Sequence, residues 1–257
     1  MSVVTTTPPE ITRAVRRLAD SVVRGAQPVY LSVHPEADAI VHECFPNVQA
    51  KIARDGGQML CGWQLWEWPH VLVEAEFHAV WISPAGEMID ITPKPEGEAR
   101  ILFVPDPRRR YKGLAIDNVR MPLRDDLLIK HFIQMSEAIV RVMNRGERAS
   151  QYGHVSVPVD EIQPLLQARD FLGQSLGAGL REHAPCLLAA AASTSAAMAR
   201  SWRRSSVANG GAPGRNRTDV YELIGRTRAR TRSEGRRVRK ISVDIRRRHE
   251  AISLHLS

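Results

Sequence analysis

Three residues within the first 90 of the chain have the side-chain types that nucleophilic cysteine catalysis needs: Cys44, His78 and Asp90. This catalysis requires a thiolate, a base that accepts and returns a proton, and a group that fixes the imidazole tautomer. Cys44 stands directly before a predicted helix, where unpaired N–H groups and the positive end of the helix dipole favour a thiolate. Each of the three requirements therefore has a candidate in this sequence.

The turn between two predicted strands decides whether His78 and Asp90 can meet. Pro84 suits the second position of a type I turn, and Gly86 suits the left-handed position that completes a three-residue loop. This loop places His78 and Asp90 as diagonal neighbours on one face of the hairpin, whereas a four-residue loop would place Asp90 opposite Ala79 on the other face. The three-residue loop pairs Ser83 with Glu87, Val80 with Asp90, and His78 with Thr92.

Residues 76–81 read Glu-Phe-His-Ala-Val-Trp, and residues 86–93 read Gly-Glu-Met-Ile-Asp-Ile-Thr-Pro. These two segments resemble the transglutaminase-like branch of the papain-like cysteine enzymes, in which a His-Ala-Trp-type strand precedes an Asp-Pro-Thr-type strand. The order Cys, His, Asp also matches. The resemblance implies a papain-like or transglutaminase-like core, with Cys44 as the nucleophile, His78 as the general base and acid, and Asp90 as the orienting carboxylate.

Four further residues are candidates for binding the substrate or its oxyanion. An oxyanion hole would use the backbone N–H of Cys44 and one more donor, either the Gln64 side chain or the Trp63 indole. Trp81 belongs to a tryptophan cluster that forms core or groove wall. Glu76 shares the face of His78 by strand parity, so it either lines a cleft for basic or amide groups or lies on a solvated strand surface.

Zinc is the second chemistry that the residue types allow. Zinc accepts nitrogen and sulfur ligands, but the sequence has no C-x-x-C or H-x-x-x-H spacing, and phosphate-loop and dinucleotide fingerprints are also absent. We therefore predict neither a metal nor a cofactor. The histidines and cysteines that raised the question lie within 45 positions: His34, His42, Cys44, Cys61, His70 and His78.

The elements that must position these residues follow from hydrophobic periodicity. Thr7-Pro8-Pro9-Glu10 predicts a helix start, with Gly25 as its end. The pattern predicts an α+β domain over residues 1–175, in which N-terminal helices pack on an antiparallel meander sheet. Further helices are predicted over 35–43, 45–54, 127–142 and 159–172, and strands over 58–66, 71–82, 87–92 and 100–104.

The net charge of +8 comes from the end of the chain. Fifteen arginines and one lysine follow Ala199 against five acidic residues, whereas the preceding part is slightly acidic. We predict that residues 176–257 form a disordered tail. Three interpretations stay open: a basic arm that binds nucleic acid, a disordered extension, and read-through into a transfer-RNA gene on the opposite strand. Codons for Asn216-Arg217-Thr218 can be the reverse complement of a sequence that resembles the T-arm of such a gene. The genomic nucleotide sequence tests the third interpretation.

The chain has no run of 18 uncharged apolar residues and no secretory signal pattern, which predicts a cytoplasmic protein without membrane contact. Its three cysteines are an odd number at wide spacing, which argues against a disulfide framework. Two functions follow from these observations. The first is a thiol-dependent acyl-transfer enzyme, such as a peptidase, amidase, deamidase or transglutaminase-type enzyme. It would act on an amide- or ester-bearing substrate such as a protein or peptide. The second is a catalytically silent domain of the same fold that acts as a binding or accessory module.

Overall fold

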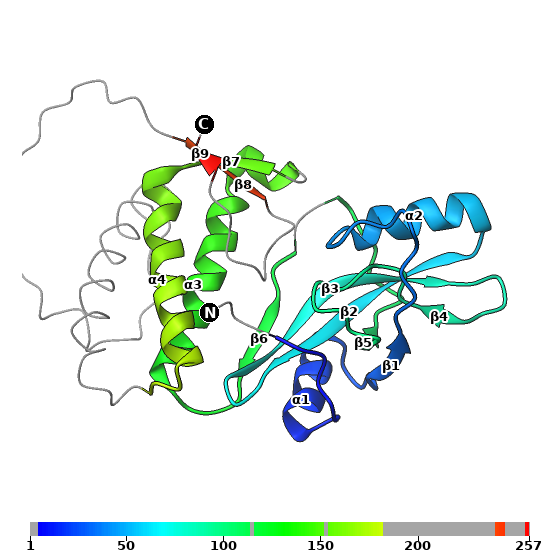
Figure 1. Ribbon diagram of the computed structural model, residues 1–257, viewed down its shortest axis with the longest axis horizontal. Coiled ribbons are helices and arrows are strands. Elements are labelled where there is room, and N and C mark those ends of the chain that lie inside the picture. The colour runs from blue at the N-terminus through cyan, green and yellow to red at the C-terminus, as the bar shows by residue number, and fades with distance from the viewer. Residues whose placement is uncertain (1–4, 114–115, 152–153, 182–239, 245–254, 257) are drawn as a thin grey trace, which may run out of the picture.

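The computed structural model describes residues 5–113, 116–151, 154–181, 240–244 and 255–256 (Figure 1). The chain has helices and an antiparallel sheet, in agreement with the predicted α+β class. The helices are α1 (Arg13–Val22), α2 (Cys44–Asp55), α3 (Leu127–Met143) and α4 (Val159–Gly177), with the 3-10 helix η1 (Gly146–Ser150). The strands are β1 (Val29–Ser32), β2 (Gln58–Trp68), β3 (Leu72–Ile82), β4 (Met88–Ile89), β5 (Arg100–Pro105), β6 (Val119–Pro122), β7 (His154–Pro158), β8 (Lys240–Asp244) and β9 (His255–Leu256).

The main sheet has the strand order β1-β5-β2-β3-β4, and β6 also pairs with β3. The predicted meander is correct for β2, β3 and β4, which follow one another as antiparallel neighbours. It is wrong for β5, which returns to the far edge of β2 and lies between β2 and β1. The free edge of β4 cannot receive β5, because the chain just beyond β1 already pairs there.

The two ends of this strand order meet, so the sheet closes into a small barrel. Val33, directly after β1, forms a parallel bridge with Asp90, directly after β4. The N–H of His34 donates to the carbonyl of Asp90 at 2.8 Å, and the N–H of Asp90 donates to the carbonyl of Ser32 at 3.1 Å. Closure satisfies the backbone groups of two short strands that would otherwise form sheet edges.

Alternating side chains along the strands separate an outer face from the barrel interior. Helices α1 and α2 cover the outer face, where Trp63, Phe77 and Trp81 share a buried cluster with Cys44 and Val15. The apolar part of the interior is filled by Leu31, Val33, Val80, Ile101 and Phe103.

The helix predictions before the barrel are partly wrong. Helix α1 begins at Arg13, because Thr12 rather than Thr7 provides the N-cap oxygen, which accepts from the N–H of Val15 at 3.3 Å. The residues before it are extended, since Thr6 pairs with Glu67. Helix α2 agrees with the prediction for 45–54, and Gly56 at φ 74° ends it as the sequence suggested.

Residues 35–43, predicted as a helix, form turns and irregular backbone instead. Neighbouring elements bind the backbone groups that a helix would have used. The N–H of Glu36 donates to the carbonyl of Ile91 at 3.2 Å, and the backbone of Ile40 is bound by the Asn47 side chain. Tertiary hydrogen bonds therefore override the weak helical pattern of this segment.

In the second half of the described chain, α3 and α4 pack against the end of the β2–β3 hairpin, and β7 packs on these two helices (Figure 1). Helix α3 agrees with its prediction, whereas α4 continues to Gly177, beyond the predicted end at 172 and the predicted domain boundary at 175. Two strands come from the predicted tail: β8 pairs with β7, and β9 pairs with β8. Residues 182–239, which include Cys186, and 245–254 lie outside the described residues, as does most of the predicted tail. Among the described residues, no helix is long and apolar enough to cross a membrane.

Candidate active site

The hairpin that carries His78 and Asp90 has the register predicted from its loop. Trp81 lies opposite Ile89 and Ile82 opposite Met88. The N–H of Ser83 donates to the carbonyl of Glu87 at 2.9 Å, so the loop between the strands consists of residues 84–86, as predicted. Gly86 has φ 87°. The positive φ explains why this position favours glycine. The register prediction is confirmed, and the two side chains share the barrel interior.

His78 and Asp90 form a buried hydrogen-bonded pair. His78 Nε2 lies 3.0 Å from Asp90 Oδ2, and the two residues are 4% and 0% exposed. The other carboxylate oxygen, Oδ1, accepts the N–H of Thr92 at 3.0 Å. Because both oxygens of Asp90 have donors, the carboxylate is held in one orientation. It in turn orients the imidazole of His78 through Nε2, so Nδ1 is the ring nitrogen that Asp90 does not bind.

Lys94 joins this pair, and sequence reasoning missed it. Its Nζ lies 2.5 Å from Asp90 Oδ2 and 3.4 Å from His78 Nε2, and it donates to Gln64 Oε1 at 3.0 Å. The Lys94 side chain is only 4% exposed. The one sequence signal was a lysine four residues after Asp90, and such spacing has no meaning for contact in an extended segment. The interior therefore holds a polar cluster of His78, Asp90, Lys94 and Gln64, which we call the interior cluster.

Electrostatics keeps the interior cluster charged. Burial and the charge of Lys94 act to lower the pKa of His78, but the Asp90 carboxylate, the charge of Cys44 and the Asp90 hydrogen bond raise the pKa of His78 to about 9. Burial acts to raise the pKa of Asp90, but the charges and hydrogen bonds of His78 and Lys94 lower the pKa of Asp90 to about 2. At neutral pH, Asp90 is thus a carboxylate and His78 an imidazolium, the state that favours a nearby thiolate.

Cys44 is the first residue of α2 and is 8% exposed. It belongs to the outer cluster with Cys61 and Phe77, whereas His78 points into the barrel. The edge of β3 opposite β2 is paired by β6 at one end and by β4 at the other, so among the described residues no strand covers 76–80 between them. In the described chain, the charge of Cys44 acts to raise the pKa of His78, whereas His78 Nε2 hydrogen-bonds to Asp90 and lies 3.4 Å from Lys94 Nζ.

Asn47, one turn into α2, fixes the segment that leads to Cys44. Its Oδ1 accepts the N–H of Ile40 at 3.0 Å, and its Nδ2 donates to the Ile40 carbonyl at 2.8 Å. The same Nδ2 donates to Thr92 Oγ1 at 3.3 Å. Asn47 thereby connects α2, the segment before Cys44 and the strand end that carries Asp90.

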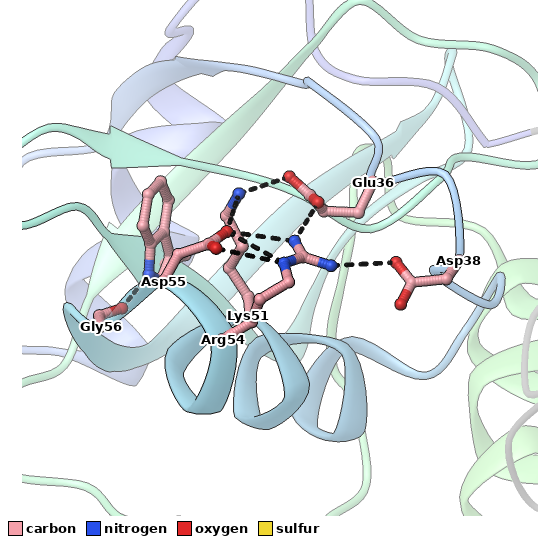
Figure 2. A network of polar contacts seen from close by, with 7 residues as sticks. Glu36, Asp38, Lys51, Arg54, Asp55 and Gly56 are labelled. Atoms are coloured by element: carbon pink, nitrogen blue, oxygen red, sulfur yellow. Dashed lines mark hydrogen bonds and ion pairs between the residues drawn. The ribbon is translucent and has the colours of Figure 1, made fainter.

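A charged network fixes the same segment from the solvent side (Figure 2). Glu36 binds Lys51 Nζ at 2.6 Å and also binds Arg54, both on α2. Asp55 lies 2.8 Å from Lys51 and joins Arg54 as well, and Asp38 completes the network. These residues hold 36–38 against the helix that begins with Cys44, so they position the candidate nucleophile without contacting it.

The two predicted oxyanion donors are buried on opposite faces. Gln64 is 1% exposed in the interior, and its Nε2 has no hydrogen-bond partner among the described residues. Trp63 lies on the outer face with Cys44, its ring 5.5 Å from that of Phe77, and its Nε1 also lacks a partner in the described part of the chain. Both N–H donors are therefore buried and unpartnered in the described part of the chain.

The two other cleft candidates have structural contacts of their own. Trp81 donates its Nε1 to the carbonyl of Gly56 at 2.9 Å, and Lys51 Nζ lies 4.6 Å from the centre of its ring. Glu76 is half-buried and accepts from Trp66 Nε1 at 2.8 Å. The structure brings neither side chain to His78.

Within the described residues, no group of three or more histidine, cysteine, aspartate or glutamate side chains is arranged to hold a metal ion. Comparison of the chain with protein-family models, with curated proteins and with solved structures gave no match.

Proposed function

We propose that the protein is a thiol-dependent acyl-transfer enzyme with a papain-like or transglutaminase-like core, acting on amide or ester substrates. The observation that supports this most is the buried 3.0 Å contact of His78 with Asp90, in a hairpin whose register brings the two together. Cys44 at the first residue of α2 supplies a thiol within electrostatic reach of that histidine. An orienting carboxylate, an imidazole and a thiol are the three parts that this chemistry uses.

The proposed reaction has two steps. The Cys44 thiolate attacks the substrate carbonyl carbon, the tetrahedral intermediate collapses, and the protonated His78 gives its proton to the departing amine or alcohol. Water or a second amine then attacks the thioester, His78 takes its proton, and the Cys44 thiolate leaves. Asp90 holds the ring throughout. Trp63 Nε1 or Gln64 Nε2 is the donor to the oxyanion, together with the Cys44 backbone N–H.

The second candidate is a catalytically silent domain of the same fold that acts in binding. Two observations favour it. Lys94 binds the carboxylate that would orient the imidazole, which gives the interior cluster a structural use. Within the described chain, Cys44 makes no hydrogen bond to His78. An amide- or ester-bearing substrate and a cytoplasmic location are predictions from the sequence that accompany the first candidate.

The rate of alkylation by iodoacetamide between pH 4 and 9 separates the two candidates. Mass spectrometry gives the rate for Cys44 and Cys61 separately in the wild type, His78→Ala and His78→Gln. If Cys44 and His78 form an ion pair, Cys44 reacts rapidly below pH 7 and loses this reactivity in both variants. Cys61 is the internal control, because burial, above all, raises the pKa of its thiol.

If Cys44 instead titrates like an ordinary thiol near pH 8.5 and responds equally in the wild type and variants, the enzyme proposal is wrong. Circular dichroism of each variant is needed beside this measurement, because His78 is 4% exposed and its loss affects folding. His78→Gln retains a hydrogen-bond donor for Asp90, so we expect it to destabilise the fold less than His78→Ala does.

A further inference from the structure

A strongly basic loop follows β5. Residues 106–112, here called the basic loop, carry four cations and one carboxylate, that of Asp106. Each of the four cationic residues is exposed, whereas the rest of residues 1–199 contains more acidic than basic residues. These cations are Arg108, Arg109, Arg110 and Lys112.

The basic loop is attached to the barrel beside Cys44. The ring of Tyr111 stacks on that of Phe45, the residue after Cys44, with the centroids 3.8 Å apart and the planes 7° apart. At the other end of the loop, the N–H of Asp106 donates to the carbonyl of Cys61 at 2.9 Å. The charges of Cys44 and Arg110 both act on the Cys61 thiol. The loop therefore contacts the N-terminal end of α2, where Cys44 lies.

Arg109 contacts an aromatic ring and a carboxylate, whereas the other cations of the loop have no carboxylate partner among the described residues. The Arg109 guanidinium lies 5.0 Å from the Trp63 ring centre and 3.6 Å from Asp106 Oδ2. Arg110 donates to backbone carbonyls of its own loop. In the described part of the chain, Arg108, Arg110 and Lys112 have no carboxylate partner, so their charges act on solvent and on whatever approaches Cys44.

We propose that the basic loop makes Cys44 select acyl substrates with carboxylates near the reacting carbonyl, that is, acidic peptide segments. Guanidinium groups bind carboxylates in paired hydrogen bonds, and several uncompensated cations at one site raise the local concentration of anions. The single carboxylate of the loop is already bound by Arg109, so it does not cancel this field. The inference names the substrate class of the proposed acyl-transfer site and rests on that proposal.

Paired alkylating reagents measure this field at Cys44 without a known substrate. Iodoacetate and iodoacetamide form the same S–C bond and expel the same iodide, but only iodoacetate is an anion. The ratio of their rates at Cys44 is measured at pH 8.5, where any thiol is partly ionised. We expect Arg108→Gln/Arg110→Gln/Lys112→Gln to lower the iodoacetate-to-iodoacetamide ratio about threefold or more at low salt, and added salt to lower the wild-type ratio toward that of the variant.

The matched control is Arg13→Gln/Arg16→Gln/Arg17→Gln, which removes the same charge from α1. It should leave the ratio at Cys44 unchanged. If the loop variant leaves the ratio unchanged, or both variants lower it equally, the inference is wrong. This result is distinct from failure of the enzyme proposal, which is read from the dependence of the iodoacetamide rate on His78 and pH.

Protection experiments test the substrate class. Hexaglutamate should slow alkylation of Cys44 by iodoacetamide in the wild type but not in the loop variant, and hexaglutamine should protect neither. An RNA oligonucleotide provides the contrasting anion. If RNA protects Cys44 in a loop-dependent manner and hexaglutamate does not, the loop recognises phosphates, and the proposal of an acidic peptide is overturned.

Discussion

Lys94 and His78 share one oxygen of a buried carboxylate: Asp90 Oδ2 lies 2.5 Å from Lys94 Nζ and 3.0 Å from His78 Nε2. Lys94 thus has two opposed effects on the candidate base. It holds the carboxylate in its charged form, and its own charge opposes protonation of His78. Predictions about the interior cluster therefore have to treat three residues together.

Replacement of Lys94 by methionine should destabilise the fold. Asp90 is 0% exposed, and loss of its ammonium partner leaves a buried charge with His78 as its only cation. Because protonated His78 still balances the charge of Asp90, the expected cost is that of one lost hydrogen bond to a buried charged group, about 1.5–3 kcal/mol. The free energy of unfolding in urea measures this effect. The matched control, Lys112→Met, removes an exposed lysine and should change the free energy of unfolding by less than about 0.5 kcal/mol.

Protonated His78 should stabilise the folded state in a defined pH range. The pKa of His78 is raised from 6.5 to about 9, so its contribution is fully present below pH 6.5 and is lost as the pH rises through about 9. The difference in unfolding free energy between the wild type and His78→Gln should therefore shrink over this interval. Urea denaturation at pH 6, 7.5 and 9.5 measures it. A constant difference would show that His78 does not titrate there.

Gly62 should resist substitution by alanine. A Cβ at this position would lie 2.3 Å from the carbonyl oxygen of Val104 and 2.4 Å from the ring of Phe103. Because Gly62 lies opposite His78, the clash would also disturb the interior cluster. We expect Gly62→Ala to lower the free energy of unfolding by about 1–3 kcal/mol. Gly177→Ala, at the end of α4, meets only a side-chain atom of Trp68 at 4.0 Å and should be neutral or stabilising.

Asn47→Ala should expose Cys44. The variant loses the bonds that hold Ile40 to α2, and the segment before Cys44 then has one anchor fewer. The rate of Cys44 alkylation by iodoacetamide at pH 8.5 should rise several-fold, while that of Cys61 stays constant. Glu36→Gln is the control at the same segment, and its effect should be smaller, because the Glu36 network lies at the solvent side (Figure 2). Equal rates in Asn47→Ala and the wild type would contradict the role of Asn47.

Features that depend on neighbours in the chain could be predicted from the amino-acid sequence. The loop at Pro84, Ala85 and Gly86 determined the hairpin register and hence the face shared by His78 and Asp90. Helices α2 and α3 likewise followed from periodicity and end signals, because helical hydrogen bonds join residues four apart. Local geometry alone decides such elements, so a pattern in the sequence suffices to predict them.

Tertiary structure decided the features that join distant segments. The bridge of Val33 with Asp90 closes the barrel, and β5 enters between β1 and β2 although its neighbours in sequence lie elsewhere. The same closure places Lys94 on Asp90 and turns 35–43 away from the helix that its composition suggested. The position of Cys44 relative to His78 across the edge of β3 likewise depends on the tertiary structure. These contacts depend on which strand edges remain open once the other strands have paired. Residue spacing in the sequence does not predict which edges these are.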